Sequence, residues 1–155
     1  MTDQTMQHPL IQLQGLSLRA PGDWERLDVP GTELVIAGPE ISDAPQDFRP
    51  NLVVLTEPSS ASIQQLSTRT MASAIADATS TYIASCNLWE AGYPARRIEF
   101  THRVGPMLVD VVKHLFATPE LAVELTFSCL VSERSAYAEL ANYIASSVEF
   151  TEEGR

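Results

Sequence analysis

The stretch HRVGPMLVDVVKHLFATPELAVELTF, from His102 to Phe127, decides the fold of this chain. Apolar and polar residues alternate along it, and two short links, Gly105-Pro106 and Thr118-Pro119-Glu120, interrupt the alternation. Alternation with period two is typical of half-buried strands, and links this short join antiparallel neighbours. The stretch therefore predicts consecutive strands of an antiparallel sheet.

The same reading extends outward to the rest of the chain. Four strands follow one another from Thr81 to about residue 131, and three more are predicted at residues 16–19, 32–39 and 51–58. A helix is predicted from a Ser62–Gln65 capping box to about Asp77. Its apolar stripe is weak, which predicts a thin contact with the sheet. These elements together predict an α+β fold, an antiparallel β-sheet with helices packed on it.

A second helix is predicted from about Glu133 to Ser147, with Ser132 as its cap. Apolar residues recur on one side of it at helical spacing, so this side is expected to pack on the sheet. The residues of this stripe are Tyr137, Leu140, Ala141, Ile144 and Val148.

Length and charge set limits on the class of protein. The 155 residues are enough for one domain, predicted at residues 15–150 between flexible tails at residues 1–14 and 151–155. The formal net charge of −10 argues against binding nucleic acid or an anionic membrane surface. The sequence contains no membrane span and no secretory signal, so we expect a cytoplasmic protein without a stable membrane anchor.

The two links also predict how the strands are aligned. A two-residue Gly105-Pro106 link places Val104 opposite Met107, and a three-residue link from Thr118 places Val109 opposite Cys129. Lys113 does not fit the apolar face that results, and either a snorkelling side chain or a bulge would explain it. The other members of that face are Ile98, Phe100, Val104, Met107, Val109, Val111, Leu115, Val123, Leu125 and Phe127.

The opposite face of the predicted sheet carries charged cross-strand rows around an apolar strip. One interpretation is a solvated face held by weak pairs, another is a catalytic site of His114, Glu124 and Asp110, and a third is a surface for a partner. The apolar strip predicts a cover, which is either a part of this chain or another protein. The predicted partner-binding residues are Arg97, Glu99, Leu108, Val112, His114, Phe116, Glu124 and Thr126.

No recognised catalytic or metal-binding motif occurs in the sequence. G-x-S-x-G, H-E-x-x-H, P-loop and G-x-G-x-x-G patterns are absent, and the predicted register puts His102 and His114 on opposite faces. We therefore expect no catalytic residues, no metal site and no cofactor. Cys86 and Cys129 are predicted to be reduced and buried, too far apart for a disulfide.

Three short motifs occur in an order that resembles the PsbP-like superfamily, and in particular its actinobacterial LpqN/LpqT branch. They are P-x-x-W at Pro21 to Trp24, F-x-P-N at Phe48 to Asn51, and G-x-P-A at Gly92 to Ala95. The resemblance implies an α/β/α sandwich without enzymatic activity. It also implies a role such as that of accessory lipoproteins, assembly factors or chaperones, although this sequence lacks the signal peptide and lipid-anchor cysteine of that branch.

Three hypotheses for the function remain open at this point. The first is a non-catalytic, chaperone-like scaffold that binds a protein partner, with a secreted or membrane-inserting protein as one candidate. The second is a carrier of a small apolar ligand between sheet and helix. The third is an enzyme that uses the polar sheet face.

Overall fold

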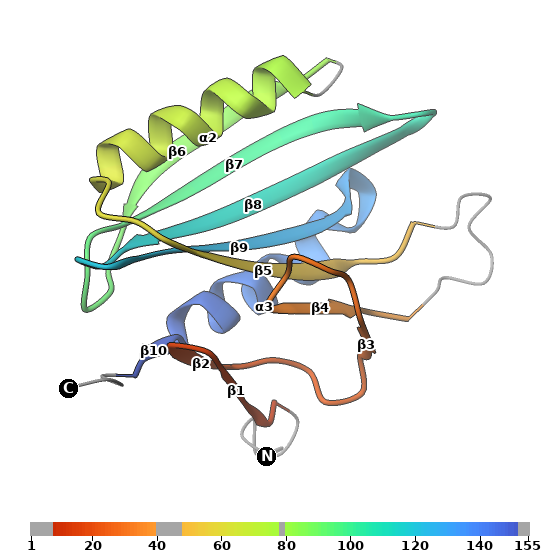
Figure 1. Ribbon diagram of the computed structural model, residues 1–155. Coiled ribbons are helices and arrows are strands. Elements are labelled where there is room, and N and C mark those ends of the chain that lie inside the picture. Colours follow the sequence, from red (N-terminus) through yellow and green to blue (C-terminus); the bar gives the residue numbers. More distant parts are fainter. Residues whose placement is uncertain (1–7, 40–47, 78–79, 152–155) are drawn as a thin grey trace.

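The structure is a computed structural model that describes residues 8–39, 48–77 and 80–151. Its centre is a seven-stranded antiparallel sheet with the strand order β3-β4-β5-β9-β8-β7-β6 (Figure 1). The strands are β3 (Glu25–Leu27), β4 (Leu34–Ala37), β5 (Asn51–Pro58), β6 (Tyr82–Trp89), β7 (Ala95–Val104), β8 (Met107–Ala117) and β9 (Leu121–Leu130).

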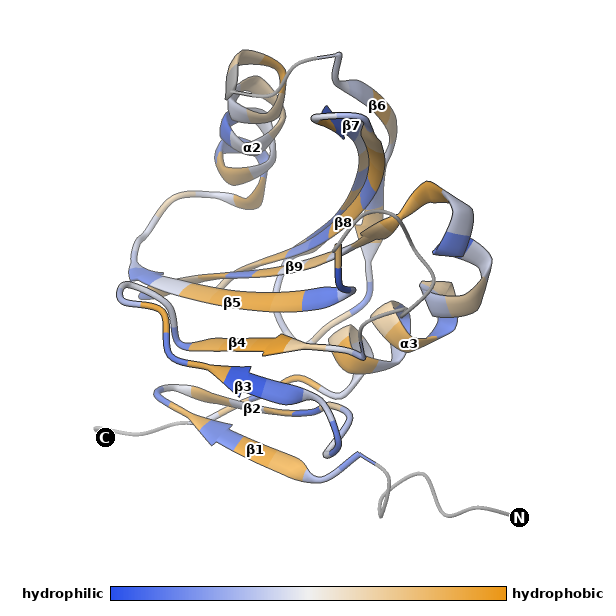
Figure 2. Cartoon of the chain, turned by 90° about the vertical axis from the view of Figure 1, so that its right-hand side faces the viewer, coloured by the Kyte–Doolittle hydropathy of each residue, from blue (hydrophilic) through white to orange (hydrophobic). Residues whose placement is uncertain are grey.

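Helices cover both faces of this sheet. Helix α2 (Ile63–Asp77) lies on one face, and the other face carries α3 (Arg134–Ser146) together with a small second sheet (Figure 2). This small sheet has the order β1-β2-β10, with β1 (Leu10–Leu13), β2 (Leu16–Arg19) and β10 (Glu149–Phe150). The predicted α+β class, an antiparallel sheet between helical layers, is confirmed.

The first and last strands were not predicted. Residues Leu10–Leu13, assigned to a flexible tail, form β1 and pair with β2, so the predicted boundary at residue 15 is too late. The four residues of β1 are too few for a clear alternating pattern. Near the C-terminus Phe150 lies opposite Leu16, so β10 pairs with β2 from the N-terminal part of the chain. Residues 1–7 and 152–155 of the predicted tails lie outside the described residues.

The two helices begin by different means. In α2 the predicted capping box is present, because the Gln65 amide N–H donates to the Ser62 hydroxyl at 3.1 Å and the Ser62 amide N–H donates to Gln65 Oε1 at 2.9 Å. The prediction that Ser132 caps α3 is wrong. A 3₁₀ turn, η1 (Val131–Glu133), precedes α3, whose N-cap is Glu133 without a side-chain capping bond.

The register between β8 and β9 differs by one residue from the prediction. Val104 lies opposite Met107 as predicted, but Val109 lies opposite Leu130 instead of Cys129. The reason is Thr118, whose amide N–H donates to the Leu121 carbonyl at 2.9 Å and whose hydroxyl accepts from the Leu121 amide at 2.9 Å. Thr118 thereby extends the hairpin, and its turn contains only Pro119 and Glu120. A one-residue shift turns every β9 side chain to the other face.

This shift divides the predicted single core into two. The cluster beneath α2 contains Ile98, Phe100, Val109, Val111 and Leu115, and the cluster on the α3 side contains Phe116, Val123, Leu125, Phe127 and Ile144. The shift also removes the difficulty with Lys113. Its ammonium group forms an ion pair with Glu124, which now lies on the same face, so neither snorkelling nor a bulge is needed.

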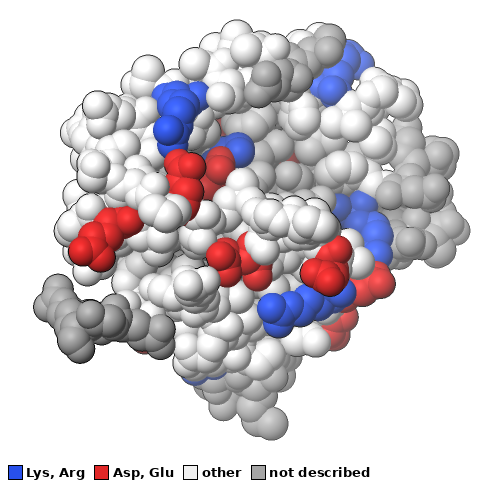
Figure 3. Space-filling model, in the orientation of Figure 1, with Lys and Arg blue, Asp and Glu red and all other residues white. Residues whose placement is uncertain are grey.

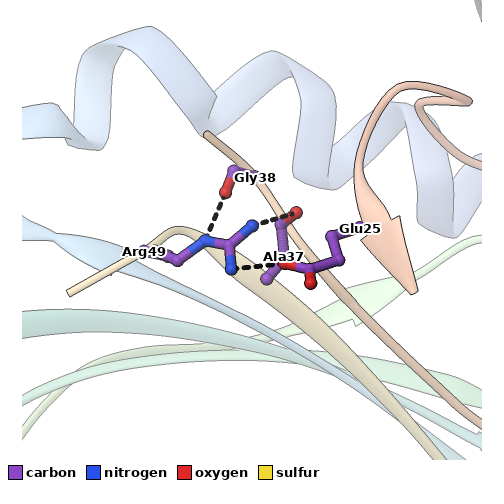
Figure 4. A network of polar contacts seen from close by, with 4 residues as sticks. All are labelled: Glu25, Ala37, Gly38 and Arg49. Atoms are coloured by element: carbon purple, nitrogen blue, oxygen red, sulfur yellow. Dashed lines mark hydrogen bonds and ion pairs between the residues drawn. The ribbon is translucent and has the colours of Figure 1, made fainter. Parts of the chain in front are cut away.

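Two of the sequence motifs meet at one end of the fold. A Cβ added to Gly38 would lie 2.9 Å from Pro50 Cγ and 3.0 Å from the Trp24 ring. The absence of a side chain at Gly38 therefore lets the Trp24 ring pack directly against the backbone there. The adjacent Arg49 donates from Nε to the Gly38 carbonyl at 2.7 Å and from Nη1 to Glu25 Oε2 at 2.7 Å (Figure 4). These motif residues therefore hold β3, β4 and the start of β5 together.

Candidate functional site

A groove lies between α2 and the sheet. Helix α2 packs mainly over β7 and β8 and leaves Glu124, Thr126 and Ser128, on the same face of β9, partly exposed. The groove has a volume of about 520 Å³, and Figure 3 shows charged side chains beside this hollow. Its lining residues are Arg69, Thr70, Ser73 and Ala74 of α2, and Phe100, His102, Val111, Lys113, Glu124, Thr126 and Ser128 of the sheet.

A second cavity of about 270 Å³ adjoins this groove. The two share Arg69, Thr70 and Glu124, and the second extends past Leu66 toward β5. Arg69 Nη2 lies 2.7 Å from Glu57 Oε1 of β5, and both side chains are exposed. The ion pair therefore connects the rim formed by α2 to the rim formed by the sheet.

The surface of the groove mixes apolar and hydrogen-bonding groups. Phe100 and Val111 contribute apolar area, and Thr126 and Ser128 contribute hydroxyls. The positive charge of Lys113 is balanced by the carboxylate of Glu124, with which it forms an ion pair. Burial lowers the pKa of His102 below its usual value, which favours the neutral form of this imidazole. Such a surface can bind a segment that is itself partly apolar and partly polar.

A buried polar cluster lies under α3, on the other face of the sheet. Glu99 accepts from two arginines, with Arg134 Nε at 3.0 Å and Arg97 Nη1 at 3.4 Å. Arg97 Nε also donates to Asn142 Oδ1 at 3.1 Å, which ties β7 to α3. The space beside this cluster is only about 90 Å³, which is far below the size of a ligand pocket.

Asp110 is a carboxylic acid of this cluster whose pKa is strongly raised. Asp110 is 3% exposed. Burial, then a hydrogen bond to Glu99 and the charge of Glu99, raise its pKa to about 7, against the opposing effect of Arg134 and Arg97. Burial likewise raises the pKa of Cys129 to about 12, with a contribution from Asp110. A thiol with so high a pKa is not a nucleophile at neutral pH.

His114 is buried nearby among aromatic side chains. Its ring lies 4.5 Å from that of Trp89, edge to face, and the residue is 2% exposed. Burial and the charge of Arg97 lower its pKa to about 3, so it is neutral at pH 7. No hydrogen-bond partner of His114 Nε2 is present among the described residues. The imidazole is therefore a neutral, buried group packed against Trp89.

The predicted partner-binding residues do not share one surface. Six of them lie on the α3 side, where Val112, His114 and Phe116 are buried. The β9 residues Glu124 and Thr126 lie on the α2 side because of the changed register, so the predicted rows that include them are wrong. The other members on the α3 side are Arg97 and Glu99, which line the small α3 cavity, and Leu108, which is exposed near one end of β8.

Sequence reasoning missed the α2 side of the groove. Arg69, Thr70 and Ser73 lie on the wall of the groove, and the one signal for them was the weak apolar stripe of the first predicted helix. The cysteines also differ from the prediction: Cys129 is buried, but Cys86 is exposed on the edge strand β6. Cys86 lies opposite Ile98, on the α2 face, and Cys129 lies on the other face.

The described residues contain neither a group of metal-binding side chains nor a helix that could span a membrane. Within residues 8–39, 48–77 and 80–151, no three or more His, Cys, Asp or Glu side chains are grouped in a way that could hold a metal ion. Across the same ranges, no helix is long and apolar enough to cross a membrane.

Comparisons with known proteins point to the fold. No protein-family model matches the chain, and no curated protein sequence matches it. LpqN of Mycobacterium tuberculosis, involved in cell envelope biogenesis, is similar with a TM-score of 0.70 at 14% identity, over 88% of this chain and 83% of that chain. Cyanobacterial PsbP from Synechocystis is similar with a TM-score of 0.64 at 16% identity, over 88% and 87%. Protein PA94 of Pseudomonas aeruginosa has a TM-score of 0.57 at 12% identity, over 85% and 89%.

Proposed function

The chain has the PsbP-like fold, and from this fold we propose that it is a non-catalytic accessory scaffold that binds a segment of a partner protein in the groove beside α2. The observation that carries the proposal is the groove itself, where Glu124, Thr126 and Ser128 of β9 are partly exposed and face the polar wall of α2. A sheet face that its own helix leaves uncovered offers a preformed surface for a strand or helix of another chain.

The chemistry of the groove favours a polypeptide over a small apolar ligand. A carrier of an apolar molecule needs an enclosed apolar cavity, whereas this groove is open and displays hydroxyls and an ion pair. A polypeptide segment presents amides and mixed side chains, which these groups can satisfy. The carrier remains the second candidate, because Phe100, Val111 and Ala74 supply an apolar strip on the groove surface.

The position of the perturbed acids and bases argues against an enzyme. Active sites usually combine shifted pKa values with a pocket for the substrate. Here Asp110, His114 and Cys129 carry the large pKa shifts. Asp110 and Cys129 line a space of about 90 Å³ under α3, and His114 is buried on the same face of the sheet. The roomy groove is on the opposite face.

The involvement of LpqN in cell envelope biogenesis supports an accessory role for a chain of the same fold. The partner class that we propose is a secreted or membrane-inserting protein, because such proteins expose apolar segments before they reach their destination. The groove would shield part of such a segment.

Site-specific photocrosslinking tests the proposal. A photoreactive amino acid replaces Ser73, which is exposed and lines the groove, and in a control protein it replaces Ser135, which is exposed on α3. We expect one host protein to cross-link at Ser73 and not at Ser135. Its peptide should map by mass spectrometry to Ser73, and the cross-link should disappear when Thr126→Trp fills the groove.

The alternatives give different results. Equal cross-linking at both positions would show that the groove is not the binding site. A lipid or other apolar molecule that accompanies the purified protein, and that Thr126→Trp displaces, would favour the carrier.

A further inference from the structure

The two edges of the seven-stranded sheet are built differently. β3, at one edge, has only three residues and includes Glu25 and Arg26. Short, charged edge strands are protected against pairing with other chains. β6, at the other edge, has eight residues and no charged side chain, and within the described residues it pairs only with β7.

Apolar side chains are exposed along this unprotected strand. Leu88 is 77% exposed and Tyr82 is 68% exposed, and Cys86 is exposed as well. A bulge between Ile83 and Ser85 interrupts the first part of β6. The run from Ser85 to Trp89 is regular, with unbroken pairing to β7, and it offers a strand edge that another chain could extend.

We propose that a second copy of this chain pairs with β6 along residues 85–89, so that two sheets join in antiparallel fashion across a two-fold axis at Asn87. In this register Asn87 lies opposite the partner's Asn87, and Cys86 lies opposite the partner's Leu88. The exposed side chains of Cys86 and Leu88, on one face of β6, then cover the same two side chains of the second copy.

The charge distribution explains why the occupant is a second copy. A two-fold antiparallel pair brings residues near the axis against their own kind, so a charge there would face a like charge. The chain has a net charge of −10, yet β6 contains no charged residue. The neighbouring charges belong to β7, such as Arg96 and Glu99, or lie just beyond the end of β6, at Glu90. A strand of this composition can pair with itself without repulsion.

The pairing is small, and it is independent of the groove. Five residues from each copy bury less area than a standard protein–protein interface, so we expect weak, concentration-dependent association. The groove residues of α2 and β9 lie elsewhere on the molecule, so failure of groove binding and failure of dimerisation can be told apart.

Sedimentation equilibrium tests the association. We expect the mass of the wild-type protein to rise from 17.0 kDa toward twice that value with concentration. Asn87→Glu places two like charges against each other at the axis and should keep the protein monomeric, with unchanged melting because Asn87 is exposed. Gln64→Glu on the exposed side of α2 makes the same change in charge and should leave the dimer intact. A wild-type protein that stays monomeric at every concentration, or an Asn87→Glu variant that dimerises as the control does, overturns the proposal.

Disulfide trapping tests the register. Residues directly opposite in an antiparallel pair have Cα atoms about 5 Å apart, within the range that a disulfide spans. Leu88→Cys should therefore yield a covalent dimer through Cys86 when the oxidant diamide takes up the two thiol hydrogens. Adding Cys86→Ser to Leu88→Cys should abolish the rapid formation of that dimer, whereas equal cross-linking of both variants would refute the register.

Discussion

Replacing Asp110 with asparagine should make the stability of this protein less dependent on pH. In the unfolded chain an aspartate ionises with its usual pKa of 3.8, whereas burial beside Glu99 raises the folded-state pKa of Asp110 to about 7. Between these two values the unfolded chain has released a proton that the folded chain retains. Rising pH therefore favours unfolding, so the wild-type protein loses stability from about pH 4 to about pH 7 and the loss levels off above that.

The size of the effect follows from the same two values. They differ by about three pH units, and one unit corresponds to about 1.4 kcal/mol. Ionisation of Asp110 thus costs the folded state at most about 4 kcal/mol at alkaline pH, which is a large part of the total stability of a domain. An asparagine at this position would keep the shape of the side chain and a donor for Glu99 without this cost.

Urea unfolding at several pH values measures the difference. We expect the free energy of unfolding of Asp110→Asn, minus that of the wild type, to increase by a few kcal/mol between about pH 4 and about pH 8. Asp23→Asn, which removes an exposed carboxylate, serves as the control and should give a nearly constant difference. A difference for Asp110→Asn that stays flat, or that falls with pH, would refute the account of the buried cluster.

Three further predictions concern packing. Ile144→Asp should destabilise the protein by several kcal/mol, since Ile144 is 0% exposed and the variant buries an unpaired charge, whereas Ser146→Asp at the exposed end of α3 should not. Val112→Arg should lower the melting temperature sharply because α3 covers Val112, and unchanged melting would show that this face is open. Cys86 should react quickly with a thiol reagent in the native protein and Cys129 only after unfolding; equal rates would contradict the burial of Cys129.

Much of the sheet follows from local sequence alone. The hairpin between β7 and β8 could be aligned because Gly105, with a φ of 60°, and Pro106 permit one tight turn, and the alternation then sets every pair. The hairpin between β8 and β9 could not be aligned in this way. There the side chain of Thr118 decides whether the turn contains two residues or three, and a count of turn-forming residues does not include that hydrogen bond.

The candidate groove depends on information that the strands do not carry. Alternation tells which side chains of β9 share a face, but not whether a helix lies over them. Here Ile63 and Leu66 anchor α2 over β7 and β8, and this position leaves Thr126 uncovered. The exposure of Cys86 has the same origin, because Cys86 lies on the α2 face of the edge strand β6, whereas α2 packs on β7 and β8.

The position of β5 between β4 and β9 constrains the order in which the chain can fold. β5 needs β9 on one side, where Asn51 lies opposite Ser128, whereas β6 to β9 pair through short turns. Closing the longer loop costs more chain entropy, so we expect the β6–β9 meander to form first and the N-terminal half, with Trp24 against Gly38, to dock later. During synthesis β4 and β5 leave the ribosome well before the strand that completes them, and in that interval the nascent chain is most exposed to pairing with the wrong neighbour.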